Sequence, residues 1–330
     1  MKRTISMVAA CAAVAMTLSA CGGQRDDSQA GSDADAESCD VGSGRVNIAT
    51  GNSTGVYYVM GGGLAELIKS ETDLQATSAE TGASVQNIEQ VVAGDYDIGF
   101  SLADTAADSV NGEGDFDSPQ DVSTLGRIYP NYTQVVVRKD SGIKTIADFK
   151  GKTISTGSPK SGTEVIANRL IEAAGLKLDD VKAQRLDLTQ TIAGMKDGSI
   201  DGFVWSGGLP TPALTDLFTS MGDDMTFVDP TPLMPKLKKV NEVYTEGSVP
   251  ASTYDLAKDI PTIVVPNVLM VSNDMPDNLA CGLTKLLYSE TDTLVDVHPA
   301  AKDIKVETAA DTKPIPVHPG SQRALDELAQ

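Results

Sequence analysis

The chain has 330 residues, of which 46 are acidic and 26 are basic, and its formal net charge is −20 at pH 7. This length exceeds what one small domain requires and fits two domains of ordinary size. The negative charge disfavours binding to nucleic acid or to an anionic lipid surface by charge attraction.

The first twenty residues have the layout of a secretory signal peptide. Lys2 and Arg3 precede an apolar run at residues 5–18, which is too short to span a bilayer permanently. The sequence LSACG at 18–22 resembles the lipobox of bacterial lipoproteins, in which cleavage leaves Cys21 as the lipid-bearing N-terminus; a plain signal peptide with an incidental cysteine is the alternative. We therefore predict an extracytoplasmic protein that lipid on Cys21 anchors to the cell membrane.

Residues 21–44 follow as a predicted disordered tether. They consist mainly of Gly, Ser, Asp and Ala and contain no aromatic side chain, a composition too polar to bury a core. Because Cys11 lies in the signal peptide, Cys39 and Cys281 remain as an even pair in an oxidising compartment. A disulfide between them and two free thiols both stay open, since connectivity cannot be deduced from sequence.

Apolar runs of strand length alternate with amphipathic stretches through the rest of the chain, which predicts an α/β fold with mostly parallel strands. In the first part, predicted strands and helices alternate, beginning with a strand, over residues 46–49, 57–69, 74–79, 84–92, 98–101 and 103–110. The polar loop at 111–121 follows; its acidic residues miss the spacing of an EF-hand, so no metal site is predicted there.

A second series of strands and helices begins after an apolar run at 134–138. Predicted strands and helices alternate again over residues 153–155, 162–174, 183–186, 189–196, 202–205 and 212–220. The apolar run at 262–271 is long enough to cross between two lobes, with 135–138 as its counterpart. We predict lobe 1 from residues 45–133 plus 273–330 and lobe 2 from residues 134–272, joined by two hinge strands with a ligand cleft between them.

The sequence Ile-x-Thr-Gly ends an apolar strand twice, at 48–51 and 154–157, and each time a run rich in Gly, Ser and Thr opens a helix. Loops at the carboxyl ends of parallel strands form the ligand crevice of such folds, and a helix N-terminus there attracts anions. Ordinary N-capping explains one such loop. Because ETGAS at 80–84 and WSGGLPT at 205–211 occupy equivalent strand ends, we predict that all four turns converge on a site for a small carboxylate.

Several stretches, in their order along the chain, resemble the TAXI family of solute receptors of TRAP transporters. They are IATGNSTGVYYVMGGGLAELI, ETGASVQNIEQVVAGDYDIGFSLADTA, GIKTIADFKGKTISTGSPKSGTEVIANRLIEAAGL, GFVWSGGLPTPALTDL, IPTIVVPNVLMVS and PIPVHPG. The resemblance implies a two-lobed periplasmic-binding-protein fold, type II-like. It also implies capture of a small organic anion or amino acid such as glutamate or 2-oxoglutarate, and delivery to a TRAP membrane permease. We expect a monomer without catalytic activity, cofactor or metal.

The predicted ligand-binding residues lie in these turns and in the helices that they open. They are Gly51, Asn52, Ser53, Thr54, Tyr57, Thr81, Ser84, Ser101, Asp104, Thr156, Gly157, Lys160, Ser161, Gly162, Thr163, Gly207 and Gly208. Two positions depart from the family pattern: Val56 replaces a usual Thr, and Lys160 replaces a usual Gly. Pairing of Lys160 with a ligand carboxylate and projection into water both stay open, and the departures leave the ligand's identity undecided.

Two other interpretations compete with a TRAP receptor. The sequence GNSTG fits the G-x-S-x-G elbow of hydrolases with Ser53 as nucleophile, and His298 and His318 follow in the required order. The elbow, however, comes after the first strand, so the strands that normally precede it are missing. A binding protein of the same fold that serves an ABC importer or a sensor kinase is the second alternative, because the sequence does not identify the surface that faces the partner.

Overall fold

The computed structural model describes residues 38–330. The predicted signal peptide, Cys21 and most of the predicted tether lie outside these residues. The strands are β1 (Ser43–Ala49), β2 (Asp73–Ala79), β3 (Ile98–Leu102), β4 (Val122–Arg138), β5 (Thr153–Ser155), β6 (Lys182–Gln184), β7 (Gly202–Gly207), β8 (Met225–Phe227), β9 (Thr245–Val249) and β10 (Ile260–Ser272).

The α-helices are α2 (Val56–Glu71), α3 (Ser84–Val92), α4 (Ala103–Asn111), α5 (Gly162–Ala173), α6 (Leu188–Asp197), α7 (Pro212–Met221), α8 (Met234–Val240), α9 (Asp277–Ser289), α10 (Thr291–Val297), α11 (Val306–Ala309) and α12 (Pro319–Leu328). Short 3₁₀ helices are η1 (Lys139–Ser141), η2 (Ile146–Phe149), η3 (Leu178–Asp180), η4 (Gly222–Asp224), η5 (Thr231–Leu233), η6 (Ala251–Thr253) and η7 (Pro299–Asp303). Within residues 38–330, no helix is both long enough and apolar enough to cross a membrane.

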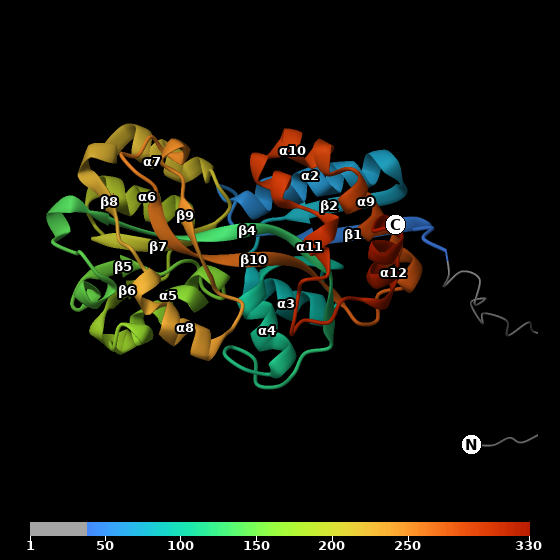
Figure 1. The fold of residues 1–330 in the computed structure, drawn as a ribbon, viewed down its shortest axis with the longest axis horizontal. Coiled ribbons are helices and arrows are strands. Elements are labelled where there is room, and N and C mark those ends of the chain that lie inside the picture. The colour runs from blue at the N-terminus through green and yellow to red at the C-terminus, as the bar shows by residue number, and fades with distance from the viewer. Residues whose placement is uncertain (1–37) are drawn as a thin grey trace, which may run out of the picture. The chain divides into compact units, whose positions relative to one another are not determined.

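The strands form one sheet in the order β2-β1-β3-β10-β4-β7-β5-β6, with β8 paired to β4 and β9 paired to β10 (Figure 1). Strand β1 is parallel to β2 and β3, and β5 is parallel to β6 and β7. The two strands in the middle, β10 and β4, run antiparallel to their neighbours. We call β1–β3 with their helices lobe 1 and β5–β7 with their helices lobe 2. The predicted two-lobed α/β fold is confirmed.

Strands β4 and β10 each pass through both lobes. The first half of β10 pairs with β9 and its second half pairs with β3 of lobe 1, while the second half of β4 pairs with β7 of lobe 2. Between the two strands, Pro130 faces Pro266, and the register shifts directly after this pair. Proline cannot donate to a strand ladder, so the ladder is weakest where the strands leave one lobe for the other.

Strand β4 is much longer than the predicted run at 134–138, because Pro130 and Asn131 interrupt its apolar pattern. Strand β1 also begins earlier than the predicted start of the folded part at residue 45. Ser43 and Gly44, assigned to the tether, pair with Asp73 and Leu74 of β2.

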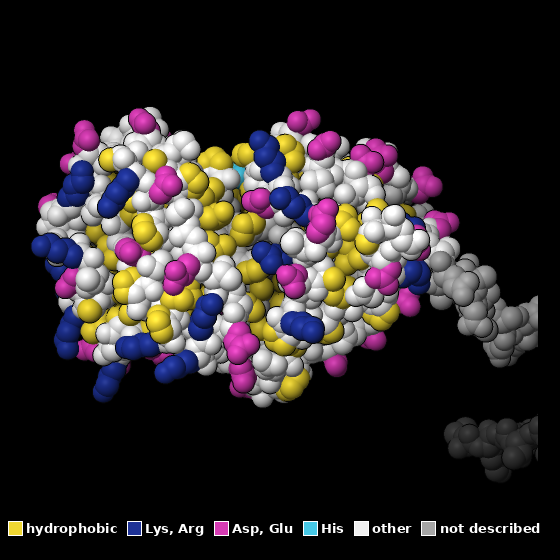
Figure 2. Space-filling model, in the orientation of Figure 1, with side chains coloured by type: hydrophobic (Ala, Val, Ile, Leu, Met, Phe, Trp, Pro, Cys, Tyr) yellow, Lys and Arg dark blue, Asp and Glu magenta, His cyan; other side chains and the backbone are white. Residues whose placement is uncertain are grey.

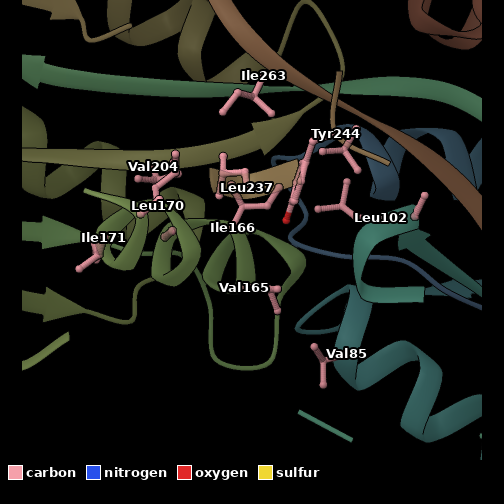
Figure 3. Packing of buried hydrophobic residues seen from close by; sticks show 14 of the residues in the cluster. Val85, Leu102, Val165, Ile166, Leu170, Ile171, Val204, Leu237, Tyr244 and Ile263 are labelled. Atoms are coloured by element: carbon pink, nitrogen blue, oxygen red, sulfur yellow. The ribbon is translucent and has the colours of Figure 1, made fainter. Parts of the chain in front are cut away.

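Buried hydrophobic side chains form three clusters, and one of them contains residues of both lobes. In this shared cluster, Val85 of α3 and Leu102 of β3 lie on the side that faces Val165 and Ile166 of α5 (Figure 3). All four are less than 10% exposed. The lobes therefore pack directly against each other beside the hinge strands.

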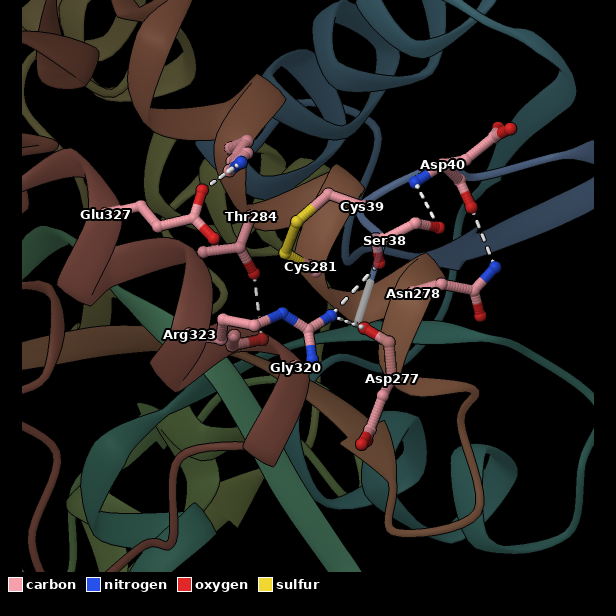
Figure 4. The surroundings of a disulfide bond; sticks show 12 residues. Ser38, Cys39, Asp40, Asp277, Asn278, Cys281, Thr284, Gly320, Arg323 and Glu327 are labelled. Atoms are coloured by element: carbon pink, nitrogen blue, oxygen red, sulfur yellow. Dashed lines mark hydrogen bonds and ion pairs between the residues drawn. A yellow bond between two sulfur atoms is a disulfide. The ribbon is translucent and has the colours of Figure 1, made fainter. Parts of the chain in front are cut away.

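Charged side chains of both signs are interspersed over the face of the molecule drawn in Figure 2. Near the beginning of the described chain, Cys39 and Cys281 form a disulfide (Figure 4). Of the two states that the sequence left open, the structure has the bonded one.

Candidate functional site

A cavity with an empty volume of about 450 Å³, partly open to solvent, lies between the lobes. Its lining residues come from the loops at the carboxyl ends of strands in both lobes and from hinge strand β4. They are Gly51, Asn52, Gly55, Val56, Tyr57, Gly82, Ala83, Ser84, Leu102, Asn131, Ser158, Ser161, Gly162, Thr163, Trp205, Ser206 and Gly207. Much of this volume lies between atoms or is open to solvent, and the centre of a water molecule can reach only about 30 Å³ of it, so the cavity in this structure suits only a small solute.

Four helices begin at this cavity. The residues directly before α2, α3 and α4 are Gly55, Ala83 and Leu102, all three line the cavity, and none caps its helix with a side-chain hydrogen bond. The fourth helix, α5, begins at Gly162, which also lines the cavity. The first N–H groups of a helix lack intrahelical partners and carry partial positive charge. The N-termini of α2 and α3, whose first turns hold no acidic residue, favour an anion in this space, whereas the first turns of α4 and α5 hold Asp104 and Glu164.

Hydroxyl groups in the cavity add hydrogen-bond donors. Thr163 Oγ1 accepts from the backbone N–H of Ser206 at 3.2 Å, and Ser161 Oγ accepts from that of Glu164 at 3.0 Å. A hydroxyl that accepts a backbone N–H still has its own hydrogen to donate. Ser206 Oγ is buried and has no hydrogen-bond partner within residues 38–330. A buried polar group of this kind calls for a partner, and a bound solute would supply one.

A chain of buried hydrogen bonds connects the cavity to both hinge strands. Tyr57 donates to Asn267 Oδ1 at 2.6 Å, and Asn267 Nδ2 donates to Asn131 Oδ1 at 2.9 Å. Asn131 Nδ2 in turn donates to the carbonyl of Ser206 at 3.2 Å. Burial raises the pKa of Tyr57 far above its usual value, so Tyr57 remains a neutral donor. The network fixes helix α2 and strand β7 against the point where the hinge strands cross.

The remaining wall of the cavity is apolar. Val56, Leu102 and Trp205 lie there, and a side chain on Gly55 would reach within 3.3 Å of the Trp205 ring. Trp205 is held in place by a hydrogen bond from Nε1 to Thr211 Oγ1 at 3.1 Å. Among the described residues that line the cavity, none carries a charged side chain.

Contacts across the rim hold the lobes together. Asn52 of lobe 1 donates to Ser158 Oγ at 3.1 Å and accepts from the backbone N–H of Leu188 at 3.2 Å. The hydroxyls of Thr54 and Thr189 are 3.3 Å apart. These bonds join lobe 1 directly to lobe 2.

Comparison with known proteins gives the family. The chain matches the NMT1-like family over residues 48–328. It belongs to this family. Solved structures with a similar fold include a protein of Bordetella bronchiseptica RB50, with 17% identity, coverage of 87% of this chain and 98% of that chain, and a TM-score of 0.55.

Two further solved structures resemble this NMT1-like protein. One is the binding protein component of an ABC phosphonate transporter from Pseudomonas aeruginosa, with 11% identity, 86% of this chain and 95% of that chain covered, and a TM-score of 0.52. The other is PhnD1 from Prochlorococcus marinus in complex with methylphosphonate, with 9% identity, 79% and 91% covered, and a TM-score of 0.51. At these identities the likeness shows a shared fold. The assignment to the TAXI family stays a prediction.

The structure brings part of the predicted site of the NMT1-like protein together. The predicted residues that line the cavity are Gly51, Asn52, Tyr57, Ser84, Ser161, Gly162, Thr163 and Gly207. Those outside its lining are Ser53, Thr54, Thr81, Ser101, Asp104, Thr156, Gly157, Lys160 and Gly208. Several of the latter support the loops: Thr81 donates to Asn87 Oδ1 at 2.6 Å, and Ser101 donates to the carbonyl of Leu102 at 3.0 Å.

Lys160 is exposed and pairs with a carboxylate of the other lobe. Its ammonium group donates to both carboxylate oxygens of Glu89 at 2.8 and 2.9 Å, and its backbone carbonyl accepts from the N–H of Gln86 at 3.2 Å. Both partners lie on α3 of lobe 1. Lys160 therefore joins the lobes at the rim, and its charge is neutralised by Glu89.

The residues of the predicted alternative hydrolase site do not form a triad. Ser53 is exposed, and its backbone N–H donates to Glu80. His298 Nε2 lies 3.1 Å from the carbonyl of Pro210, and His318 Nδ1 accepts from the N–H of Gly320 at 3.2 Å. Each histidine thus has a partner other than Ser53.

Sequence reasoning missed two asparagines of the site. Asn131 and Asn267 lie inside the apolar hinge strands, 136 positions apart, and meet only because β4 pairs with β10. Their one visible signal is an amide side chain in the middle of an otherwise apolar run. Ser206 was quoted in the turn WSGGLPT, of which only Gly207 and Gly208 were predicted to bind ligand, although Ser206 belongs to β7 and lines the cavity.

Beside the cavity, a buried ionic network crosses between the lobes. Arg169 of α5 pairs with Asp104 at 3.2 Å and Asp108 at 2.5 Å, both on α4. Tyr244 donates to Asp104 at 2.6 Å, and Asn241 donates to the Asp104 carbonyl at 3.1 Å. Asp104 was predicted to bind ligand; it is instead fully buried in this network.

The network should make stability depend on pH. Burial raises the pKa of Asp108 to about 6, although the charge of Arg169 opposes this effect. A carboxyl pKa that is higher in the folded state stabilises the fold at low pH, and this contribution is lost as the pH rises from about 4 to about 6. Relative to an Asp108→Asn variant, the wild-type protein should lose about 3 kcal/mol of unfolding free energy between pH 4 and pH 7. Urea unfolding at several pH values tests this, and a difference that does not change with pH would contradict it.

Proposed function

We propose that this NMT1-like protein is an extracytoplasmic solute-binding protein that closes around a small anion and passes it to a membrane importer. The observation that carries the proposal is the cavity itself, where four helices begin and neutral donors from both lobes meet. Helix N-termini and hydroxyls hold an anion without a cationic side chain. The signal-like first twenty residues support the location outside the cytoplasm.

The importer is proposed to be of the ABC type. One protein of similar fold is the binding component of an ABC phosphonate transporter, and another was solved with methylphosphonate. The TRAP permease and the glutamate-like ligand have only the sequence resemblance to support them. We therefore prefer the alternative of an ABC importer, with lipid on Cys21 as the proposed anchor.

Part of the free energy of solute binding would stabilise the closed arrangement of the two lobes. The open form exposes the loops of lobe 1, and a bound anion then gains donors such as Ser161 and Thr163 from lobe 2. Because a ligand shifts a conformational equilibrium by its difference in affinity for the two states, contacts from both lobes stabilise the closed form. Bending at Pro130 and Pro266, where the hinge strands cross, is the motion that we expect.

Calorimetry of the mature protein with propionate, methanesulfonate and methylphosphonate tests the function. We expect at least one of these anions to bind and to change the fluorescence of Trp205, which lines the cavity and is the single tryptophan of the chain. Acetamide and glycerol serve as neutral controls. The proposal fails if the neutral compounds bind and none of the anions does.

Closure should be sensitive to Gly162. A side chain at this position would lie 2.5 Å from Leu102 Cδ1 and 2.6 Å from Ser84 Oγ, both of which belong to lobe 1. Gly162→Ala should therefore oppose closure and weaken anion binding by about 1–3 kcal/mol, a typical cost of overpacking. Isothermal titration with the best anion measures this effect. Gly62→Ala is the matched control, because a side chain on Gly62 meets nothing within 4 Å; equal losses of affinity in both variants would argue against closure at Gly162.

A further inference from the structure

Resting on the proposed function, we infer that the solute of this cavity carries an anionic head and a short apolar body and has no ammonium group. The ligand class is then a small organic acid, such as a 2-oxo acid, rather than an amino acid. The inference depends on which kinds of polar group the cavity offers and which it lacks.

The described lining of the cavity offers no anionic partner for an ammonium group. Burying a cation without an anionic or multiple carbonyl partner is costly, and the described lining residues include no Asp or Glu. The carboxylates on the surrounding loops are already engaged. Glu80 accepts from the N–H of Ser53, Glu89 pairs with Lys160, and Glu164 pairs with Arg185.

The side-chain oxygens at the cavity already accept hydrogen bonds from the protein. Asn131 Oδ1 accepts from Asn267 Nδ2, and Asn52 Oδ1 accepts from the N–H of Leu188. The hydroxyls of Ser161 and Thr163 accept backbone N–H groups, so that their remaining polar capacity includes an O–H donor. O–H donors therefore remain available toward a solute at Ser161 and Thr163.

The helix N-termini point to the same sign of charge. Four helices begin at the cavity; the first turns of α2 and α3 hold no acidic residue and carry partial positive charge, whereas those of α4 and α5 also hold Asp104 and Glu164. The partial positive charge attracts a carboxylate and repels an ammonium group a few ångströms away. In an amino acid the carboxylate and the ammonium group are bonded to the same carbon atom. An amino acid whose carboxylate lay at the positive end of the cavity would therefore place its ammonium group there too.

Part of the lining suits an apolar body. Val56, Leu102 and Trp205 present carbon atoms there, and Trp205 Nε1 is already bonded to Thr211. A head held by the helix N-termini would place a short hydrocarbon chain against these side chains. Contact of an ammonium group with the Trp205 ring is the main competing arrangement, and the experiment decides between the two.

Matched pairs of solutes that differ only at the carbon next to the carboxylate test the inference. Calorimetry of the full mature protein compares pyruvate with L-alanine, 4-methyl-2-oxopentanoate with L-leucine, and 2-oxoglutarate with L-glutamate. In every pair with a measurable member, the 2-oxo acid is expected to bind at least 100-fold more tightly. The inference is supported equally if propionate, methanesulfonate or methylphosphonate binds and none of the amino acids binds.

An amino acid that binds as tightly as its 2-oxo partner overturns the inference and leaves the proposed function intact. If neutral compounds bind and no anion does, the proposed function fails and the inference fails with it.

A gain-of-function variant adds a second readout. Ser206→Asp brings a carboxylate to the buried, unpartnered Oγ position and should lower the preference for the 2-oxo acid at least tenfold, whereas Ser206→Asn should not. If a folded Ser206→Asp variant kept the wild-type preference for the 2-oxo acid, the absence of a carboxylate from the cavity would not be the cause of that preference.

Discussion

Arg169→Met is expected to lower the free energy of unfolding by about 3–5 kcal/mol, the usual cost of removing one partner from a buried ion pair. The guanidinium group is the only cation in contact with Asp104 and Asp108 among the described ion pairs. The side chains of these two carboxylates are 0% and 4% exposed. Methionine fills much of the same volume but leaves two acidic groups buried without a positive charge.

Urea unfolding at pH 7 measures the loss, and Arg185→Met provides the matched control. Arg185 also pairs with a carboxylate, that of Glu164, but its own side chain is 55% exposed. Exposed pairs of this kind contribute about 0–1 kcal/mol, so the control variant should remain close to wild type. Equal losses in both variants would mean that burial does not decide the strength of the Arg169 network.

The same substitution should also weaken solute binding. Arg169 lies on α5 of lobe 2, whereas both carboxylates lie on α4 of lobe 1. The network therefore contributes to the closed form in addition to the fold. Because affinity includes the cost of reaching the binding-competent state, a less stable closed form raises the apparent dissociation constant even though Arg169 does not line the cavity.

The parts of the site that could be predicted are those that depend on local sequence. Gly51 and Asn52 follow the first strand directly, and Ser161, Gly162 and Thr163 open a helix after the fifth strand, so strand-end rules place them at one crevice. The alternation of apolar and polar residues was also sufficient to predict the α/β class and one strand that crosses between the lobes. These features require no knowledge of which distant segments meet.

Contacts that depend on the other lobe could not be predicted from the local sequence. Lys160 looks like a ligand partner until Glu89, 71 positions away, is seen beside it. Asp104 looks like a site residue until Arg169, 65 positions away, is seen to neutralise it. The distances between these side chains in space cannot be predicted from charge and spacing along the chain, because they depend on how the two lobes pack.

The disulfide holds the first described segment against the C-terminal helices. Cys39 bonds to Cys281 of α9, and Asn278 of the same helix donates to the carbonyl of Asp40 at 2.7 Å (Figure 4). Arg323 of α12 donates to the carbonyl of Ser38 at 3.1 Å. Gly282 permits this contact, since a side chain there would lie 2.5 Å from the Cys39 carbonyl oxygen.

Removing the disulfide should cost about 2–5 kcal/mol of unfolding free energy, because the bond closes a loop of 242 residues and so restricts the unfolded chain. We expect a Cys39→Ala/Cys281→Ala variant to unfold at lower urea concentration than the oxidised protein. A reducing agent should lower the midpoint of the wild type and leave that of the variant unchanged. Neither cysteine lines the cavity, so solute affinity at 25 °C should be the same in both proteins; a variant that lost affinity while still folded would show that the segment before β1 also positions the loops of lobe 1.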